Sequence, residues 1–147
     1  MRISGSARPA ASGVEIVIQN VASYRSLAVA DLRRWLGSMI EDLAPEAQTF
    51  GVRFNGIRAM TSMNRSYRGK DGPTDVLSFP GEPGGHLGDV VVCVPQAALQ
   101  AGTRRHTVER EIRLLLLHGV LHCLGHDHET DDGGMERLET RLRRRWL

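Results

Sequence analysis

The feature that most constrains this fold is the segment over residues 108–124, which is apolar on nearly all sides. The leucines at positions 114 to 117 point in different directions once the segment is helical, so no face of it is left for solvent. A helix that is apolar all round is buried in the core of a protein. We therefore expect this segment to be the central buried helix. We expect it to end at Gly125, because glycine tolerates the left-handed backbone that caps many helices.

The rest of the chain alternates between short strands and helices with one apolar face. Strands are expected over residues 14–18, 50–55, 75–79 and 89–94, and further helices over 32–43, 57–67, from 95 onward and over 133–145. This order predicts a single α+β or α/β domain, in which a mixed four-stranded sheet is covered by about five helices. We place that domain at residues 14–147. A flexible arm, rich in Ser, Ala, Gly and Arg, is expected over residues 1–13.

Composition narrows the class of protein and its setting. A length of 147 residues, of which 24% are charged, favours one globular domain over several. No stretch approaches the roughly 18 to 20 apolar residues that span a bilayer, and the first residues contain no apolar block typical of a signal peptide. The expected location is therefore the cytoplasm, with no membrane partner. Cys93 and Cys123 are expected to be reduced, buried thiols.

The distribution of basic residues is more informative than their sum. The formal net charge of +2 is smaller than the excess that identifies a nucleic-acid binder. Three basic groups stand out: Arg65, Arg68 and Lys70; Arg104 and Arg105; and Arg141, Arg143, Arg144 and Arg145. Each group can contact phosphate, while a solvated helix face is the alternative interpretation of the last.

Two histidines interrupt the buried helix at a spacing that suits a metal ion. His118 and His122 lie four residues apart, which on a helix separates them by about 40° around the axis and roughly 6 Å along it. Two imidazoles so placed can converge on one ion at nitrogen to metal distances of about 2.0 to 2.1 Å. Burying both rings without partners would cost on the order of a few kcal/mol, which favours ligands over structural histidines.

The third ligand follows from the expected helix end. A straight ladder through His126 would extend roughly 12 Å along the axis and could not close on one ion. If the chain turns back at Gly125, His128 approaches the ion from another direction, and we favour it as the third ligand. Three protein ligands leave one position for water, as in a catalytic zinc site.

The reaction is constrained by a residue that the helix lacks. Zinc peptidases with the His-Glu-x-x-His motif place a glutamate after the first histidine as general base, whereas position 119 is glycine. A peptidase is therefore the weaker interpretation. A zinc-bound water is a competent nucleophile, so hydrolysis of a phosphodiester is compatible with the residues present, provided that a cation neutralises the charge developing on the phosphate.

Three segments together carry a resemblance to a known family. They are MNRSYRGKDGPTDVLSFP over residues 63–80, LGDVVV over 87–92, and HGVLHCLGHDH over 118–128. In this order they resemble the YbeY family of rRNA maturation factors. One position departs from the family, which usually has Tyr or Phe where this chain has His126.

The resemblance implies a metal-dependent endoribonuclease specific for single strands, acting in 16S rRNA 3′ end maturation and ribosome quality control. Its three metal-binding histidines correspond to His118, His122 and His128, and its functionally important arginine to Arg68. It also implies a mixed sheet whose metal helix is placed as in zinc peptidases. The implied partners are single-stranded RNA, especially rRNA, and the ribosome or its small subunit.

Several alternatives stay open at this point. Arg68 either holds the scissile phosphate through its guanidinium or bonds a carbonyl or Asp71 as a turn residue. We expect Asp127 to orient a metal-binding histidine. We expect the metal site to tolerate His126, which leaves open whether this histidine competes for the metal or shuttles protons. Zinc is the expected ion, although three imidazoles also suit nickel, copper or cobalt. The alternative functions are a ribosome assembly factor with a structural metal and a zinc hydrolase of another bond, such as a peptide.

Overall fold

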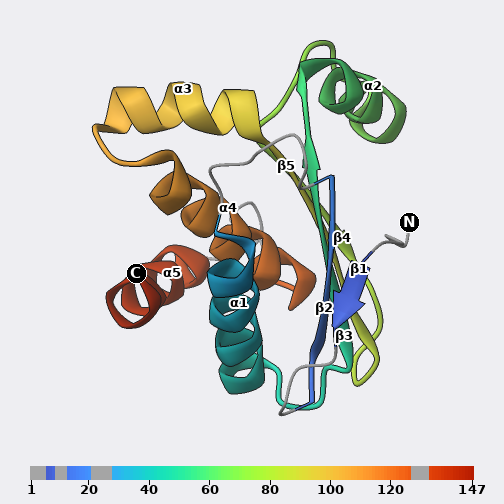
Figure 1. The fold of residues 1–147 in the computed structure, drawn as a ribbon, viewed down its shortest axis with the longest axis vertical. Helices are drawn as coiled ribbons and strands as arrows, with labels where there is room; N and C mark the ends of the chain where they lie inside the picture. The colour runs from blue at the N-terminus through green and yellow to red at the C-terminus, as the bar shows by residue number, and fades with distance from the viewer. Residues whose placement is uncertain (1–5, 9–12, 21–27, 127–132) are drawn as a thin grey trace.

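The structure, a computed structural model, describes residues 6–8, 13–20, 28–126 and 133–147. Within these parts of the chain, five strands and five helices form one layered domain (Figure 1). The strands are β1 (Ser6–Arg8), β2 (Glu15–Gln19), β3 (Thr49–Asn55), β4 (Val76–Pro80) and β5 (His86–Cys93). The helices are α1 (Val29–Leu43), α2 (Ile57–Arg68), α3 (Val94–Arg104), α4 (Val108–Cys123) and α5 (Gly134–Trp146).

The strands form one mixed sheet in the order β1-β2-β3-β5-β4. Strands β2, β3 and β5 run parallel, because α1 and α2 intervene in the chain between them, and β4 pairs antiparallel with β5 after a short connection. Strand β5 is buried along almost its whole length, as expected for a strand covered on both faces. This order places β4 at one edge of the sheet, beside the helix that carries the histidines.

Helices cover both faces of the sheet (Figure 1). Helices α1, α4 and α5 lie on one side, and the large core cluster fills the space between them and the strands. Helix α2 lies on the other side, over a smaller cluster formed by Met60, Leu77, Val91 and Cys93. Apolar residues of β4 alternate between the two clusters, with Val76 packed against the first and Leu77 within the second.

The predicted α+β class, mixed sheet and set of five helices are confirmed, with ends that shift by a few residues. Helix α4 is central and buried, and all four of the leucines at positions 114 to 117 are shielded from solvent. The expected strand count of four is corrected to five, because Ser6–Arg8 pairs antiparallel with β2 as a short extra strand. This strand lies within the stretch that we expected to be an arm. Three residues are too few to show a periodic pattern from which the pairing could be predicted.

None of the helices that the structure describes combines the length and the apolar character needed to cross a membrane.

Candidate active site

A cleft of about 910 Å³ opens beside the edge of the sheet, between the end of α2 and the second half of α4. Strand β4 forms its floor. The residues that line it are Tyr67 and Arg68 from α2, residues 74–80 along β4, His118 and His122 from α4, and Gly125 and His126 just beyond that helix. The structure therefore brings Arg68 and both histidines to one cavity, although about fifty residues separate them in the chain.

The floor of the cleft presents backbone groups that face away from the sheet. Among the described strands, β4 has a neighbour on one side only. The carbonyl of Asp75 accepts a hydrogen bond from the amide of Cys93 at 2.9 Å, so Asp75 faces β5. Because backbone groups alternate in direction along an antiparallel strand, the N–H groups of Val76 and Ser78 point away from β5, toward the cleft. Pro80, next in this series, has no N–H to present.

The two histidines of α4 bring their Nε2 atoms close together. The Nε2 atoms of His118 and His122 lie 2.9 Å apart. Their ring centroids are 4.5 Å apart, and the ring planes make an angle of 73°. Two nitrogens this close can both reach a single ion at bond lengths of about 2.0 to 2.1 Å. The spacing predicted from the sequence is thus realised in the geometry of the rings.

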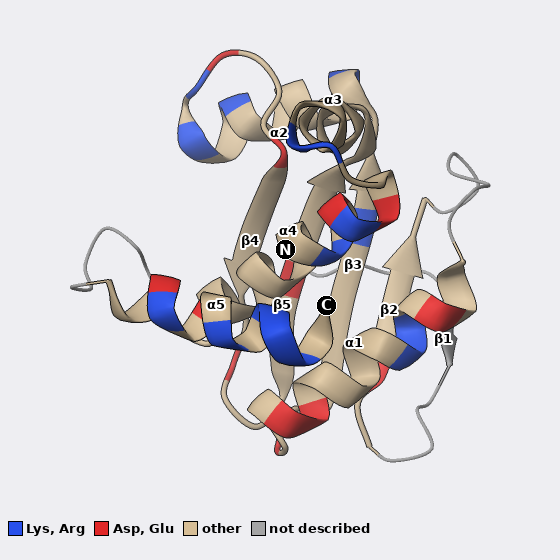
Figure 2. Cartoon of the chain, turned by 90° about the vertical axis from the view of Figure 1, so that its left-hand side faces the viewer, with Lys and Arg blue, Asp and Glu red and all other residues tan. Residues whose placement is uncertain are grey.

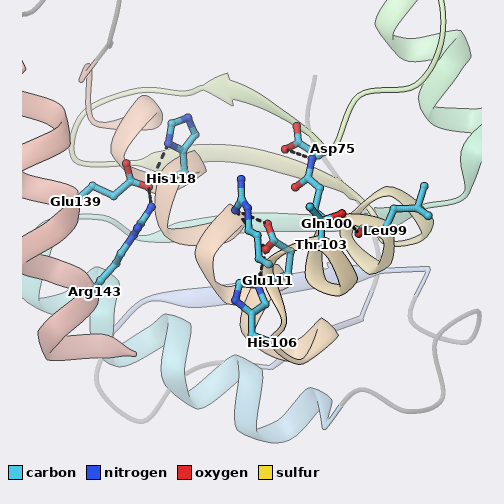
Figure 3. A network of polar contacts seen from close by, with 10 residues as sticks. Asp75, Leu99, Gln100, Thr103, His106, Glu111, His118, Glu139 and Arg143 are labelled. Carbon is cyan, nitrogen blue, oxygen red and sulfur yellow. Dashed lines mark hydrogen bonds and ion pairs between the residues drawn. The ribbon is translucent and has the colours of Figure 1, made fainter.

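Glu139 holds the opposite nitrogen of His118 (Figure 3). This α5 side chain is buried, and its Oε1 lies 3.4 Å from Nδ1 of His118 and 3.4 Å from Nη2 of Arg143. The hydrogen bond from His118 lowers the pKa of Glu139, burial opposes that effect, and the nearby charges of His118 and Arg143 reinforce it. The carboxylate therefore favours the tautomer of His118 with a proton on Nδ1. That tautomer directs the Nε2 lone pair toward the cleft.

Sequence analysis missed Glu139 and expected a carboxylate from Asp127 instead. Asp127 lies outside the described residues. One signal could have found Glu139: it occupies the same face of α5 as the buried residues Met135 and Leu142, four residues after the first and three before the second. A carboxylate on the apolar face of an amphipathic helix needs a buried polar partner.

The glycine between the histidines has a steric reason. A Cβ atom at position 119 would lie 2.7 Å from both methyl carbons of Val90 and 3.1 Å from Oγ of Ser78. Val90 is fully buried, so it cannot move aside freely. Gly119 therefore lets α4 approach β5 and β4 closely enough to bring the histidines to the sheet edge. The same contact leaves no room for the glutamate of the peptidase motif.

The predicted helix end at Gly125 is confirmed. Gly125 has a φ of +96°, in the left-handed region. Its N–H donates to the carbonyl of His122 at 3.0 Å, and the N–H of His126 donates to the carbonyl of Leu121 at 3.0 Å. This pair of bonds is a Schellman motif, which satisfies the last carbonyls of a helix while the chain turns back.

Two further histidines, His126 and His128, follow the turn at Gly125. His126 follows the turn directly and lines the cleft. His128, the predicted third ligand, lies outside the described residues. Within the parts of the chain that the structure describes, no three His, Cys, Asp or Glu side chains converge as a set of metal ligands.

Arg68 stands across the cleft from the histidines, in the last turn of α2. That helix ends at Gly69, which has a φ of 65° and caps the carbonyls of Asn64 and Arg65. The alternative interpretation, a bond from Arg68 to Asp71, does not hold, because the partner of Asp71 is Arg65 at 3.0 Å. Among the described residues Arg68 makes no hydrogen bond or ion pair, and it is an exposed residue that lines the cleft.

Basic residues gather on two elements of the fold, α2 and α5. Figure 2 shows Lys and Arg at the end of α2 and along α5, above and below β4 in that view. Such a distribution raises the local concentration of an anionic ligand despite the small net charge.

Neither cysteine offers a reactive thiol. Burial, with a smaller contribution from the charge of Asp89, raises the pKa of Cys123 to about 12. Burial is also the main cause that raises the pKa of Cys93. Both thiols are free, as predicted, with Cys93 buried and Cys123 half-buried. Because the thiolate is the nucleophile, a cysteine mechanism in the cleft is disfavoured at neutral pH.

A single α+β domain that presents paired histidines from a buried helix to an open cleft is compatible with a metal-dependent hydrolase. The sequence model of the family described as Endoribonuclease YbeY matches residues 17–146. The chain belongs to the endoribonuclease YbeY family.

Individual relatives agree with this assignment. The chain is 46% identical over 123 residues to the Endoribonuclease YbeY of Solibacter usitatus, covering 83% of this chain and 80% of that protein. It is 37% identical over 134 residues to the Endoribonuclease YbeY of Thermus thermophilus, covering 86% and 96%. The solution structure of TM1509 from Thermotoga maritima is similar, with a TM-score of 0.59 and 25% identity over 87% of this chain and 85% of that one.

Proposed function

We propose that this protein is a zinc-dependent endoribonuclease specific for single-stranded RNA, and that it acts in 16S rRNA 3′ end maturation and ribosome quality control. The observation that carries the proposal is the convergence of the Nε2 atoms of His118 and His122 on a cleft that also contains Arg68. Membership of the endoribonuclease YbeY family supports the same substrate.

His118 and His122 would hold the ion, together with His128 as the proposed third ligand. The donor set fits zinc because imidazole nitrogens are among its usual ligands, although other divalent transition metals suit it too. Glu139 would keep the Nδ1 proton on His118 and so preserve the lone pair that binds the metal. When bound, zinc lowers the pKa of a coordinated water and polarises a phosphoryl oxygen.

Arg68 binds and neutralises the phosphate in this proposal. A guanidinium offers a planar fork of donors that matches two phosphate oxygens, and Arg68 is exposed toward the cleft for this purpose. The backbone N–H groups of Val76 and Ser78 supply further donors along the floor. The cleft volume of about 910 Å³ suits a few nucleotides of one strand better than a duplex.

The proposed partners are rRNA and the ribosome or its small subunit. The chain has only seven aromatic residues, Phe, Tyr and Trp together, so extensive readout of bases by stacking is not expected. We infer that the ribosomal context supplies much of the selectivity. The proposed location is the cytoplasm, because ribosomal subunits are assembled there.

The test pairs metal content with cleavage. Purified, untagged protein is assayed for bound metal by mass spectrometry and for cleavage of a labelled single-stranded RNA before and after chelation. We expect one zinc per chain and cleavage that is lost on chelation or in His122→Ala and returns with added metal in the wild type. Metal binding without cleavage would favour the assembly factor, cleavage of peptides alone would favour the other hydrolase, and a protein without metal would refute the proposal.

A matched pair of arginine variants tests the phosphate site. We expect Arg68→Ala to slow cleavage by about 10²-fold or more, the usual cost of removing one group that stabilises transition-state charge. Arg65→Ala is the control, because Arg65 lies on the same helix but pairs with Asp71 and does not line the cleft. Equal rates for the two variants would contradict the assignment of Arg68.

A further inference from the structure

We propose that Tyr67, held by Phe79, is a stacking surface for one nucleobase of the RNA strand in the cleft. This inference rests on the proposed function and adds a residue that selects unpaired bases. It begins from a side chain whose exposure nothing in the fold explains.

Tyr67 leaves an aromatic ring open to solvent at the site itself. Its exposed fraction is 57%, and among the described residues the other large apolar side chains with comparable exposure are Ile57 and Leu99. Of these three, Tyr67 alone is aromatic and lines the cleft. Covering an exposed ring with another flat apolar surface is favourable, because it removes both surfaces from water.

Phe79 fixes the orientation of that ring. The two ring centroids lie 5.1 Å apart with an interplanar angle of 74°, an edge-to-face contact. Phe79 itself packs against the buried cluster under α2, which includes Met60 and Leu77. The Tyr67 ring is therefore held on one side by a residue anchored in the core. A ring ordered before the ligand arrives loses little conformational entropy on binding.

The surroundings of Tyr67 match a nucleotide better than another flat apolar ligand. Arg68 follows it directly in the chain and lines the same cleft, and the exposed side chain of Lys70 lies just beyond the end of α2. Proteins that bind single strands combine positive charge along the backbone with aromatic rings on which bases stack. A base on Tyr67 would place its own phosphate beside Arg68, on the path toward the two histidines.

This arrangement gives the specificity for single strands a physical cause. Bases within a duplex are already stacked and paired, so only an unpaired base can turn out onto an exposed ring. Because every base has a flat face, one ring selects for strandedness and not for sequence. The scarcity of aromatic residues in the chain is consistent with a single such contact.

The experiment measures binding separately from cleavage. The full chain carrying His122→Ala, which keeps the probe intact, is titrated with a single-stranded oligoribonucleotide containing 2-aminopurine, a fluorescent base that is quenched when it stacks. We expect quenching on binding, and we expect Tyr67→Ala to remove it and to weaken affinity by about 5- to 150-fold, the usual effect of losing one base-stacking contact. Tyr67→Phe should retain both, because it keeps the ring.

Controls separate stacking from packing. Tyr67→Leu keeps an apolar side chain that packs on Phe79 but removes the flat face, so it should behave as Tyr67→Ala does. Leu99→Ala, which changes another exposed apolar side chain that does not line the cleft, should bind as the parent does. An oligonucleotide with abasic positions should bind to the parent less tightly than the intact oligonucleotide does. The two oligonucleotides should bind to Tyr67→Ala with equal affinity.

The outcomes distinguish this inference from the proposed function. If the parent binds RNA and Tyr67→Ala binds it equally well with the same quenching, the stacking role is refuted while the nuclease proposal stands. If the parent protein fails to bind single-stranded RNA and the wild type fails to cleave it, the proposed function is refuted, and the inference with it.

Discussion

Replacing Gly119 with alanine tests the close contact between α4 and the sheet. The added Cβ would lie 2.7 Å from both Val90 methyl carbons and 3.1 Å from Ser78 Oγ, so α4 must shift or the strand must yield. Overpacking a well-packed core costs about 1 to 3 kcal/mol. Alanine regains about 1 kcal/mol through its higher helix propensity. Because two rigid methyl groups are involved, we expect the upper end of the cost and a net loss of about 2 kcal/mol in the free energy of unfolding.

The control is Gly102→Ala in α3. Gly102 is exposed, and an added Cβ there meets nothing within 4 Å. This variant should gain stability through helix propensity, by up to about 1 kcal/mol. Urea denaturation measures the free energy of unfolding of both variants. The difference between the two values gives the packing cost at position 119, which we expect to be about 3 kcal/mol. If Gly119→Ala proves as stable as Gly102→Ala, the steric explanation for the glycine is wrong.

Two further predictions concern buried carboxyl groups. Glu139→Gln removes the charge that holds His118 Nδ1, so the affinity for the proposed zinc ion, measured with a competing chelator, should fall by about 10-fold or more. Glu136→Gln, on the exposed face of α5, should match the wild type. His106→Ala removes the contact of 2.6 Å between Nε2 of His106 and Oε1 of the fully buried Glu111. We expect this change to lower the free energy of unfolding by about 1 to 3 kcal/mol. An unchanged denaturation midpoint would contradict this prediction.

Residue pattern alone predicted the elements of this fold well, because each element carries its own signal. Apolar positions at helical spacing marked α1, and the all-apolar segment marked α4 as the central helix. Gly125 marked a helix end because few other residues tolerate its backbone conformation. The spacing of His118 and His122 predicted that their rings would converge, and the structure shows this convergence.

The arrangement of elements in space was harder to predict, because pairing between distant segments leaves little trace in a single sequence. Nothing in the pattern shows that β5 lies between β3 and β4, and so nothing shows that β4 is an edge strand. Arg68 was assigned to the site through family resemblance, since its distance in the chain from the histidines hides their proximity. Glu139 was missed because its partner lies on another helix.

The open edge of β4 has a consequence for how copies of this protein meet one another. Exposed strand edges invite pairing with a strand of a second molecule, which is a route to aggregation. Here the edge strand is short. Its outward N–H groups are those of Val76 and Ser78, and Pro80, the next residue that faces outward, has no N–H group. The edge also lies at the bottom of a cleft between α2 and α4. The helices that line this cleft hinder a second flat sheet from reaching the edge, whereas a flexible single chain can enter the recess. The recess therefore protects the protein from association with itself while it keeps the strand accessible to substrate.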